Sequence, residues 1–452
     1  MLRVYLPMEI YNREYAGKLA LASELLKHDV EIIIGYNLGV RSKVLTDGSQ
    51  EGAADDLGEA IYYEIKGQSI RGMEHLNLFS ESGITIVGQD EEAGISYANF
   101  EDFITLRPET QGLDLFDAYF AYGEQDFKKY SLGGNGSKVH LTGSPRLSFW
   151  GEPGREFYEN EILEAQNRFG EFVLIASNTT FQNRIISRRQ MNKIPVSMGY
   201  PKEYKRIQLK KRANWEKEAF QITVNAVQEI LESTNLNILI RPHPVEDQQV
   251  WLERFSHSER VFVEKNGPIT PLILAAKYVI HAGSTAGLES LMCETPTISL
   301  VGMISTDWFT MLPDKYSRQP SSMKELGSLL NIGFTNLIDS EQIGEYLSNC
   351  GSLKAAEIQA KIILSLPRKI RIPISTPMPV NNLRFHSIVK RIIDRIRFGK
   401  SATDSLNLNK RPMITLKQIQ SDLSRMNQIT KNDGFYRVQQ LEESTFRISN
   451  VK

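Results

Sequence analysis

The sequence predicts an α/β fold made of two doubly wound, Rossmann-like domains. Short aliphatic runs alternate with helix-like stretches along most of the chain, and Gly, Ser or Pro closes the runs. The chain has 452 residues, which is enough for two or three domains. We expect a first Rossmann-like domain over residues 1–160, a second over 161–366, and a basic linker with a helical appendage over 367–452.

The first domain begins with a strand, a loop, a helix and a second strand. Residues 2–6, LRVYL, form a short β-rich run. The helix is predicted from the spacing of Leu19, Leu21, Leu25 and Leu26. The run VEIIIG at 30–35 is nearly continuous, as expected of a parallel strand that is covered on both faces. Three similar runs follow, at 84–89, 117–123 and 138–145.

The second domain follows a helix-like connector, and its first strand is predicted in FVLIASN, residues 172–178. The strongly charged stretch 181–232 is predicted to be largely helical, with a loop from Pro195 to Pro201. Four short aliphatic runs then each end in a loop, at 236–244, 260–265, 277–284 and 295–302. Strands that alternate with helices in this way indicate a doubly wound sheet.

Composition and charge narrow the class of protein. With 41% hydrophobic and 24% charged residues, the chain is typical of globular proteins. A net charge of −1 gives no overall field that would attract nucleic acid, so we expect no nucleic-acid partner. The two cysteines form no spaced framework, and we find neither a signal peptide nor an apolar run of about 18 residues. We therefore expect a soluble cytoplasmic protein.

The composition shifts near residue 367 to a stretch rich in proline and basic residues, which is typical of a linker. Residues 383–400 then carry many basic side chains against one acid, Asp394, and their isoleucines recur at helical spacing. This basic amphipathic helix fits peripheral binding to anionic lipid at the inner face of the cytoplasmic membrane. A helix packed on the protein with a solvated basic face fits equally well. The polar residues that follow are expected to form a small helical appendage or to be partly disordered.

The first candidate site is the stretch RPHP, which lies where a predicted buried strand ends. Pro242 and Pro244 fix the backbone on either side of His243, so the imidazole is expected to project from the strand end. With Arg241 beside it, the imidazole suits contact with a phosphate group, as a hydrogen-bond donor or a cation. The alternative is a loop histidine that caps a neighbouring helix.

The second candidate site is the turn between the strand 278–281 and the helix that follows it. Gly283 permits close approach of the backbone to a ligand, and Ser284 and Thr285 supply hydroxyls at the start of the helix. The free N–H groups of a helix N-terminus bind anions, and Glu289 is placed to accept hydrogen bonds from ribose hydroxyls. We expect the two loops to grip one nucleotide from neighbouring strand ends. The alternative is an ordinary capped helix.

The third candidate site is an acidic cluster in the first domain. Asp90, Glu91 and Glu92 directly follow a predicted strand, and mutual repulsion is expected to raise the pKa of one of them toward the range of a general base. The alternative is a solvated acidic turn. Further candidates at the join of the domains, either facing an acceptor or forming surface ion pairs, are Glu9, Arg13 and Arg146.

No metal site is predicted, because the other histidines lack the spacing of metal ligands. Those that stand alone are His28, His75, His140, His257 and His386.

Several of these segments, in their order along the chain, resemble the bacterial surface polysaccharide biosynthesis proteins. They are the N-terminal "VYLPMEIYNREYAGKLALASELLKHDVEIIIG", then "QDEEAG", "TGSPR", "ILIRPHPVED" and "HAGSTAGLESLMCETPTIS". That group is similar to GT-B glycosyltransferases that use CMP-activated sugars, including sialyl-, polysialyl- and Kdo-transferases. The resemblance covers about residues 1–350 and implies a GT-B-like fold, in which two Rossmann-like domains face a cleft.

The resemblance implies an inverting, metal-independent transfer of a sugar from a CMP-sugar to a glycan or lipid-linked glycan, with no cofactor. His243-Pro244 matches the family's His-Pro motif, which contacts the donor phosphate, and Ser284-Thr285 match its hydroxyl-bearing loop. The family's acidic-acidic-Gly motif supplies the catalytic base. Here it reads Glu91-Glu92-Ala93-Gly94, with an extra residue before the glycine, so the base is one of Asp90, Glu91 and Glu92. We favour Glu91.

Three other functions remain open at this point. A sugar-nucleotide epimerase and a CDP-polyol phosphotransferase would share the double-Rossmann build. The altered acidic motif also permits a non-catalytic assembly protein that keeps the nucleotide pocket and docks other polysaccharide enzymes.

Overall fold

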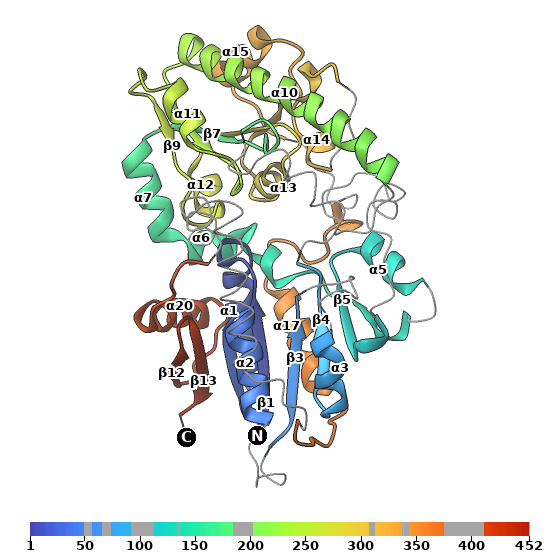
Figure 1. Cartoon of the computed structure of the whole chain (residues 1–452). Coiled ribbons are helices and arrows are strands. Elements are labelled where there is room, and N and C mark those ends of the chain that lie inside the picture. The colour runs from blue at the N-terminus through green and yellow to red at the C-terminus, as the bar shows by residue number, and fades with distance from the viewer. Residues whose placement is uncertain are drawn as a thin grey trace.

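The computed structural model has two lobes, each built on its own β-sheet (Figure 1). It describes residues 1–48, 57–65, 74–91, 113–132, 136–183, 202–306, 312–336, 338, 343–374 and 411–451. The predicted loop from Pro195 to Pro201, the basic helix 383–400 and Glu92 lie outside these ranges. Within them, no helix combines the length and the apolar character needed to cross a bilayer.

The first lobe contains an eight-stranded sheet in the order β12-β13-β2-β1-β3-β4-β5-β6. Its strands are β1 (Leu2–Met8), β2 (Val30–Tyr36), β3 (Ala60–Glu64), β4 (Thr85–Gly88), β5 (Ala118–Ala121), β6 (Val139–Leu141), β12 (Tyr436–Glu442) and β13 (Thr445–Asn450). The strands β1 to β6 pair in parallel, whereas β13 runs antiparallel to both β2 and β12. The helices of this lobe are α1 (Tyr11–Leu26), α2 (Asn37–Gly48), α3 (Glu74–Glu81), α5 (Glu124–Ser131), α17 (Lys354–Ser365) and α20 (Leu416–Ile429), with short 3-10 turns η2 (Leu113–Leu115), η3 (Gly136–Lys138) and η4 (Pro145–Phe149).

The second lobe contains a parallel five-stranded sheet in the order β11-β10-β7-β8-β9. Its strands are β7 (Phe172–Ala176), β8 (Asn237–Arg241), β9 (Val261–Val263), β10 (Tyr278–His281) and β11 (Thr297–Ser299). Two helices connect the lobes, α6 (Glu152–Phe157) and α7 (Glu159–Phe169). The remaining helices are α10 (Lys202–Ser233), α11 (Gln249–Arg254), α12 (Thr270–Ala275), α13 (Thr285–Met292), α14 (Leu312–Tyr316) and α15 (Met323–Ile332), with the 3-10 turn η5 (Leu300–Met303).

Burial on both faces explains the continuous aliphatic runs of the strands. In β2, Ile32 and Ile34 pack in one hydrophobic cluster with α1, α17 and α20, while Ile33 packs in another with α2 and α3. In the second sheet, Val173 packs under α10 and Leu174 packs against α7, α12 and α13. Successive side chains of a strand point to opposite faces, so a sheet with helices on both sides needs apolar residues at every position. The predicted fold class, two Rossmann-like sheets in a GT-B-like arrangement, is confirmed.

The C-terminal segment belongs to the first lobe, whereas the sequence predicted a small helical appendage or partial disorder. The helix α20 is present beside α1, and the hairpin β12–β13 after it extends the first sheet past β2 (Figure 1). On the other side of α1 lies α17, where Gln359 donates to Thr142 Oγ1 over 3.1 Å. All strands of the second sheet fall within 161–366, so we keep the predicted domain ranges as a proposal, with α17 and residues 411–450 added to the first lobe.

A close approach of α1 to η4 helps to place Arg13 and Arg146 in the wall of one cavity at the join of the lobes. A Cβ atom at Gly17 would lie 2.7 Å from the backbone nitrogen of Arg146, so only glycine permits this contact. The packing of α1 therefore fixes part of the cleft described below.

We expect Gly17→Ala to lower the free energy of unfolding by about 1–3 kcal/mol, because the added methyl overpacks the α1–η4 contact. The control is Gly344→Ala, since a Cβ there meets nothing within 4 Å; we expect it to change stability by less than about 0.5 kcal/mol. Urea unfolding monitored by circular dichroism measures both. Equal stabilities of the two variants would show that the α1–η4 contact is not tight.

Candidate functional site

A cavity of about 360 Å³ lies between the two lobes and brings most of the predicted site residues together. The second lobe lines it with the ends of β7 and β8, with Ile269 and Thr270, and with the first turns of α13; the first lobe lines it with the start of α1 and with η4. The carboxyl ends of parallel strands are where open α/β sheets bind ligands, because backbone donors and helix N-termini converge there. The predicted residues that line the cavity are Arg13, Arg146, Arg241, His243, Pro244, Ser284, Thr285 and Glu289.

The imidazole of His243 is exposed at the end of β8, as its two prolines predict. The backbone N–H of Val245 donates to His243 Nδ1 over 3.3 Å. Because Nδ1 accepts this bond, the neutral ring carries its proton on Nε2. His243 therefore presents a hydrogen-bond donor at the cavity.

The loop that carries His243 is anchored from below by Glu246, which is fully buried. Its carboxylate accepts hydrogen bonds from Ser177 Oγ at 2.8 Å, from the backbone N–H of Thr179 at 2.7 Å and from Trp251 Nε1 at 3.2 Å. Burial raises the pKa of Glu246, and these donors partly offset the rise. Glu246 was not predicted as a site residue; its place three residues after His243 was the only signal.

The turn before α13 is held in place by hydrogen bonds of its own backbone N–H groups. Gly283 adopts φ +59°, in the left-handed region that favours glycine, and its N–H donates to Asp314 Oδ1 over 3.2 Å. Ser284 is the N-cap of α13, and its hydroxyl accepts from the backbone N–H of Ala286. Thr285 is exposed at the first turn of the helix. The N-terminus of α13 thus faces the same cavity as His243.

Beneath this turn lies the buried side chain of His281. Its Nδ1 accepts from the backbone N–H of Ser284 over 3.4 Å, and its Nε2 lies 2.9 Å from Ser317 Oγ. The ring packs closely against Gly287, where a Cβ would lie 2.3 Å from Nε2 in ideal geometry, so the helix begins directly over it. Burial lowers the pKa of His281, although Asp314 opposes the shift.

The sequence predicted that the two loops follow neighbouring strands. In the structure they do not, because β7 lies between β8 and β10. The residues at the end of β7 bind both loops. Ser177 and Thr179 donate to Glu246 under the His243 loop, and Asn178 Nδ2 donates to the carbonyl of Gly283 over 3.0 Å. Residues 177–179 therefore hold the two loops at a fixed separation.

Arg241 has a different role from the one predicted. Its guanidinium is buried and donates to the backbone carbonyls of Glu264, Asn266 and Gly267. Burial lowers the pKa of Arg241 to about 10. The side chain holds the 264–267 loop in place, and its donors are used there instead of on a phosphate.

Glu289 lies at the wall of the cavity, in the second turn of α13. Thr270 Oγ1 donates to its carboxylate over 2.5 Å. Burial raises the pKa of Glu289, against the opposing effects of Thr270 and of the positive charge of Arg146. A carboxylate at this depth suits the predicted acceptance of hydrogen bonds from ribose hydroxyls.

The facing lobe supplies positive charge through Arg13 and Arg146. Arg13 pairs with the buried Glu14 at 2.6 Å, and Arg146 donates to the carbonyl of Glu91 over 3.1 Å while lying 5.6 Å from the Trp150 ring. Glu9 donates its backbone N–H to Glu14 and does not line the cavity with its side chain. Glu14 was not predicted as a site residue. Burial raises the pKa of its carboxyl, and the charge of Glu91 adds to the rise.

The acidic cluster differs from its prediction. Glu91 is buried, its Oε1 accepts from Lys18 Nζ over 2.8 Å, and it does not line the cavity. Burial disfavours the charged carboxylate, but Lys18, together with the positive charges of Arg146 and Arg13, lowers the pKa of Glu91 below its ordinary value, where a rise was expected. Asp90 is also buried, and its backbone N–H donates to the Tyr119 hydroxyl.

No family model matches the chain, and no curated protein is significantly similar to it. Among solved structures, the chain is similar to the UDP-GlcNAc 2-epimerase from Methanocaldococcus jannaschii, at 12% identity over 80% of this chain and 99% of the other, with a TM-score of 0.48. It is also similar to the UDP-GlcNAc 2-epimerase from Neisseria meningitidis, at 12% identity over 81% and 98% of the two chains, with a TM-score of 0.45. The wall teichoic acid polymerase TagF matches at 9% identity over 80% and 88%, with a TM-score of 0.43. At these identities, the substrate of this chain has to be argued from its own residues.

The buried ring under α13 predicts a pH dependence of stability. Burial lowers the pKa of His281 in the folded state below the ordinary histidine value of about 6.5, so the unfolded chain binds a proton that the folded chain resists. This contribution to stability is full above about pH 6.5 and is lost as the pH falls below it, by at most about 1.4 kcal/mol per pH unit for one proton. We expect urea unfolding between pH 7.5 and 5.5 to show a smaller loss of stability in His281→Gln than in wild type. An identical pH slope in both proteins would contradict the buried neutral ring.

Proposed function

We propose that the chain is a glycosyltransferase that transfers a sugar from a CMP-sugar to a glycan acceptor in bacterial surface polysaccharide biosynthesis. One observation carries the proposal. The proline-flanked His243, the N-terminus of α13 and the carboxylate of Glu289 line a single cavity, across which Arg13 and Arg146 lie on the other lobe. His243 can donate a hydrogen bond to an anion, the helix end attracts negative charge, and Glu289 can accept hydrogen bonds from hydroxyls. A nucleoside monophosphate needs these three kinds of group.

The same groups account for the chemistry of transfer. As the bond between the sugar and the phosphate breaks, negative charge builds on the departing nucleotide. His243 Nε2–H and the positive end of the α13 helix dipole stabilise that charge without reorganising, because Glu246 and residues 177–179 already hold them in place. The choice of a cytidine nucleotide rests on the resemblance of His243-Pro244 and Ser284-Thr285 to the family motifs. Such transfer requires no metal ion, so the protein's own donors carry the leaving-group charge.

The role proposed for Glu91 changes from base to positioning residue. Its carboxylate is ion-paired with Lys18 and lies outside the cavity lining, and its carbonyl accepts from Arg146. A carboxylate with a lowered pKa is a weaker base, so this arrangement favours a role in fixing Lys18 and Arg146. The assignment of the base to the acidic cluster stays a proposal; Asp90 is buried like Glu91 and does not line the cavity either.

The acceptor and the location follow as further parts of the proposal. A lipid-linked glycan at the inner face of the cytoplasmic membrane fits a transferase of this class, and the basic stretch 383–400 suits an anionic surface. Sedimentation with anionic liposomes, with and without residues 375–410, tests that part separately.

The proposed nucleotide site is tested by affinity for CMP. We expect His243→Asn to weaken CMP binding about tenfold or more, because one hydrogen bond to a charged phosphate is worth about 1.5–3 kcal/mol, and to leave the binding of cytidine unchanged. The control is His257→Asn, an exposed histidine that does not line the cavity, which should bind CMP as wild type does. Isothermal titration measures all three proteins. Equal CMP affinity in wild type and His243→Asn would overturn the assignment.

The class of donor is tested by a thermal-shift panel of CMP, CDP, UDP and GDP, followed by assays for CMP release from CMP-sialic acid and CMP-Kdo. We expect CMP to raise the melting temperature most, since a ligand that binds only the folded state stabilises it by mass action. Conversion of UDP-N-acetylglucosamine alone would indicate an epimerase, and a phosphodiester in the product would indicate a phosphotransferase.

The positioning role of Glu91 predicts a loss of stability, with little effect on nucleotide binding. Glu91→Gln leaves the buried Lys18 ammonium without its partner, so we expect the free energy of unfolding to fall by about 3–5 kcal/mol while CMP affinity stays within about twofold. The matched control on α1 is Glu24→Gln, which removes a more exposed pair with Lys27 and should cost less than about 1 kcal/mol. A Glu91→Gln protein that unfolds like wild type but has lost all transfer would restore Glu91 as the base.

A further inference from the structure

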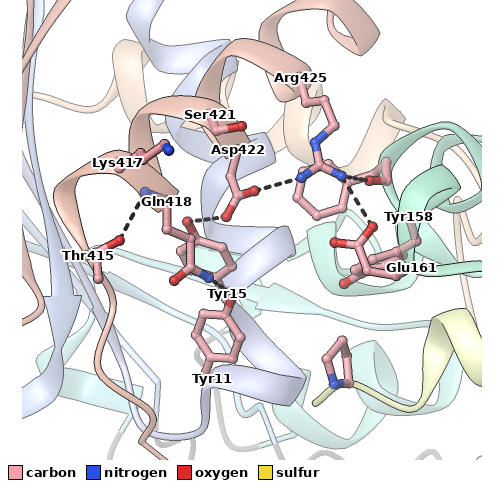
Figure 2. A pocket seen from close by; sticks show the side chains of 12 residues that line it. Tyr11, Tyr15, Tyr158, Glu161, Thr415, Lys417, Gln418, Ser421, Asp422 and Arg425 are labelled. Carbon is pink, nitrogen blue, oxygen red and sulfur yellow. Dashed lines mark hydrogen bonds and ion pairs between the residues drawn. The ribbon is translucent and has the colours of Figure 1, made fainter. Parts of the chain in front are cut away.

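A second cavity, of about 390 Å³, lies beside the first one, between α1, the α6–α7 connector and α20 (Figure 2). No residue predicted from the sequence lines it, and α20 comes from the C-terminal segment that was expected to be an appendage. Its volume is within the range of about 300–1,000 Å³ typical of small-molecule sites.

Aromatic rings from two elements form the apolar part of this cavity. Tyr11 and Tyr15 of α1 stack with their centroids 4.5 Å apart and their planes at 26°. Phe157 and Tyr158 of the connector meet edge to face at 4.9 Å. These four rings make up the apolar part of the cavity wall, and three of them, Tyr15, Phe157 and Tyr158, are largely buried.

Polar side chains of α20 and α7 form the rest of the wall. Asp422 accepts from the Tyr15 hydroxyl over 2.9 Å and from Arg425 NH2 over 3.1 Å, and Gln418 Nε2 donates to the Tyr11 hydroxyl over 2.6 Å (Figure 2). Arg425 also donates to Glu161 over 3.3 Å. These bonds fix the orientation of the rings and of the polar groups before any ligand arrives.

The charges of this cavity cancel. Glu161 and Asp422 contribute two acids, and Lys417 and Arg425 contribute two bases. The aromatic faces and the balanced charges therefore favour a neutral ligand that has one apolar face and several hydroxyls. A phosphate or a nucleotide would need donors in excess, which the first cavity has and this one lacks.

The two cavities share a wall. Tyr158 lines both of them, and Pro268 of this cavity directly precedes Ile269 and Thr270 of the first. The loop that carries Pro268 is held by the guanidinium of Arg241 through the carbonyls of Asn266 and Gly267. The two cavities are therefore adjacent.

We propose that this cavity binds a sugar ring of an oligosaccharide, and that it holds the acceptor glycan while its terminal residue enters the cleft. A pyranose has a face of C–H groups, whose slight positive charge is attracted to the electron-rich faces of Tyr11 and Tyr158, and a rim of hydroxyls that pairs with Asp422, Arg425 and Gln418. The sugar site stands on the cavity alone; its role as an acceptor subsite rests on the proposed function. The segment 411–451 thereby becomes a part of the substrate site.

The test compares two tryptophan substitutions on α20. Ser421 lines the cavity, whereas Ser424, one turn along and also exposed, does not. The probes are cellobiose, lactose, maltose and chitobiose at concentrations up to about 50 mM, well above the millimolar dissociation constants of weak ligands. Saturation-transfer NMR measures their binding to the full chain, and CMP affinity is measured in parallel.

We expect at least one disaccharide to bind wild type and Ser421→Ala, to bind Ser424→Trp equally well, and to bind Ser421→Trp at least tenfold more weakly, with CMP affinity unchanged in all. Should Ser421→Trp fail to fold, Lys417→Ala replaces it and should weaken the same disaccharide severalfold. The proposal is overturned if wild type binds none of the four sugars, or if the cavity variants bind them as tightly as Ser424→Trp does. Disaccharide binding with this pattern but no CMP binding would keep the sugar site and refute the proposed function. CMP binding without disaccharide binding would refute the sugar site and keep the proposed function.

Discussion

The site depends on the three residues that directly follow β7. Ser177 and Thr179 bind the carboxylate under the His243 loop, and Asn178 binds the carbonyl of Gly283 at the entrance to α13. Because β7 lies between β8 and β10, these short side chains set the distance between two anion-binding groups that belong to different loops. Pre-set donors of this kind stabilise developing charge without the cost of reorganisation, which is what loss of a nucleotide leaving group requires.

The facing lobe contributes through buried ion pairs instead of a free carboxylate. Lys18 pairs with Glu91, and Arg13 pairs with Glu14, under the side of the cleft where Arg13 and Arg146 line the cavity. Removing two charges from water is costly, so such pairs persist where they hold a side chain in one position. The packing of Gly17 against η4 completes this wall, and the C-terminal segment packs beside α1.

The sequence predicted those parts of the site whose geometry depends only on residues close to one another in the chain. Pro242 and Pro244 identify the exposed His243, and Gly283 with Ser284 identifies the start of α13, since strand ends and helix caps depend on neighbouring residues. The order of the strands is not a local property, so the place of β7 was missed. Lys18 and Glu91 are 73 positions apart, and the hairpin β12–β13 buries Phe446 and Ile448 in an otherwise polar segment, so neither left a pattern in the sequence.

Hydrogen–deuterium exchange with CMP, and with cytidine as the control that lacks the phosphate, tests the central claim most directly. If His243 and the start of α13 grip one phosphate, CMP slows exchange at both 243–247 and 284–288, and cytidine slows neither to the same degree. Protection of only one of these segments, or equal protection by CMP and cytidine, would contradict the shared phosphate site.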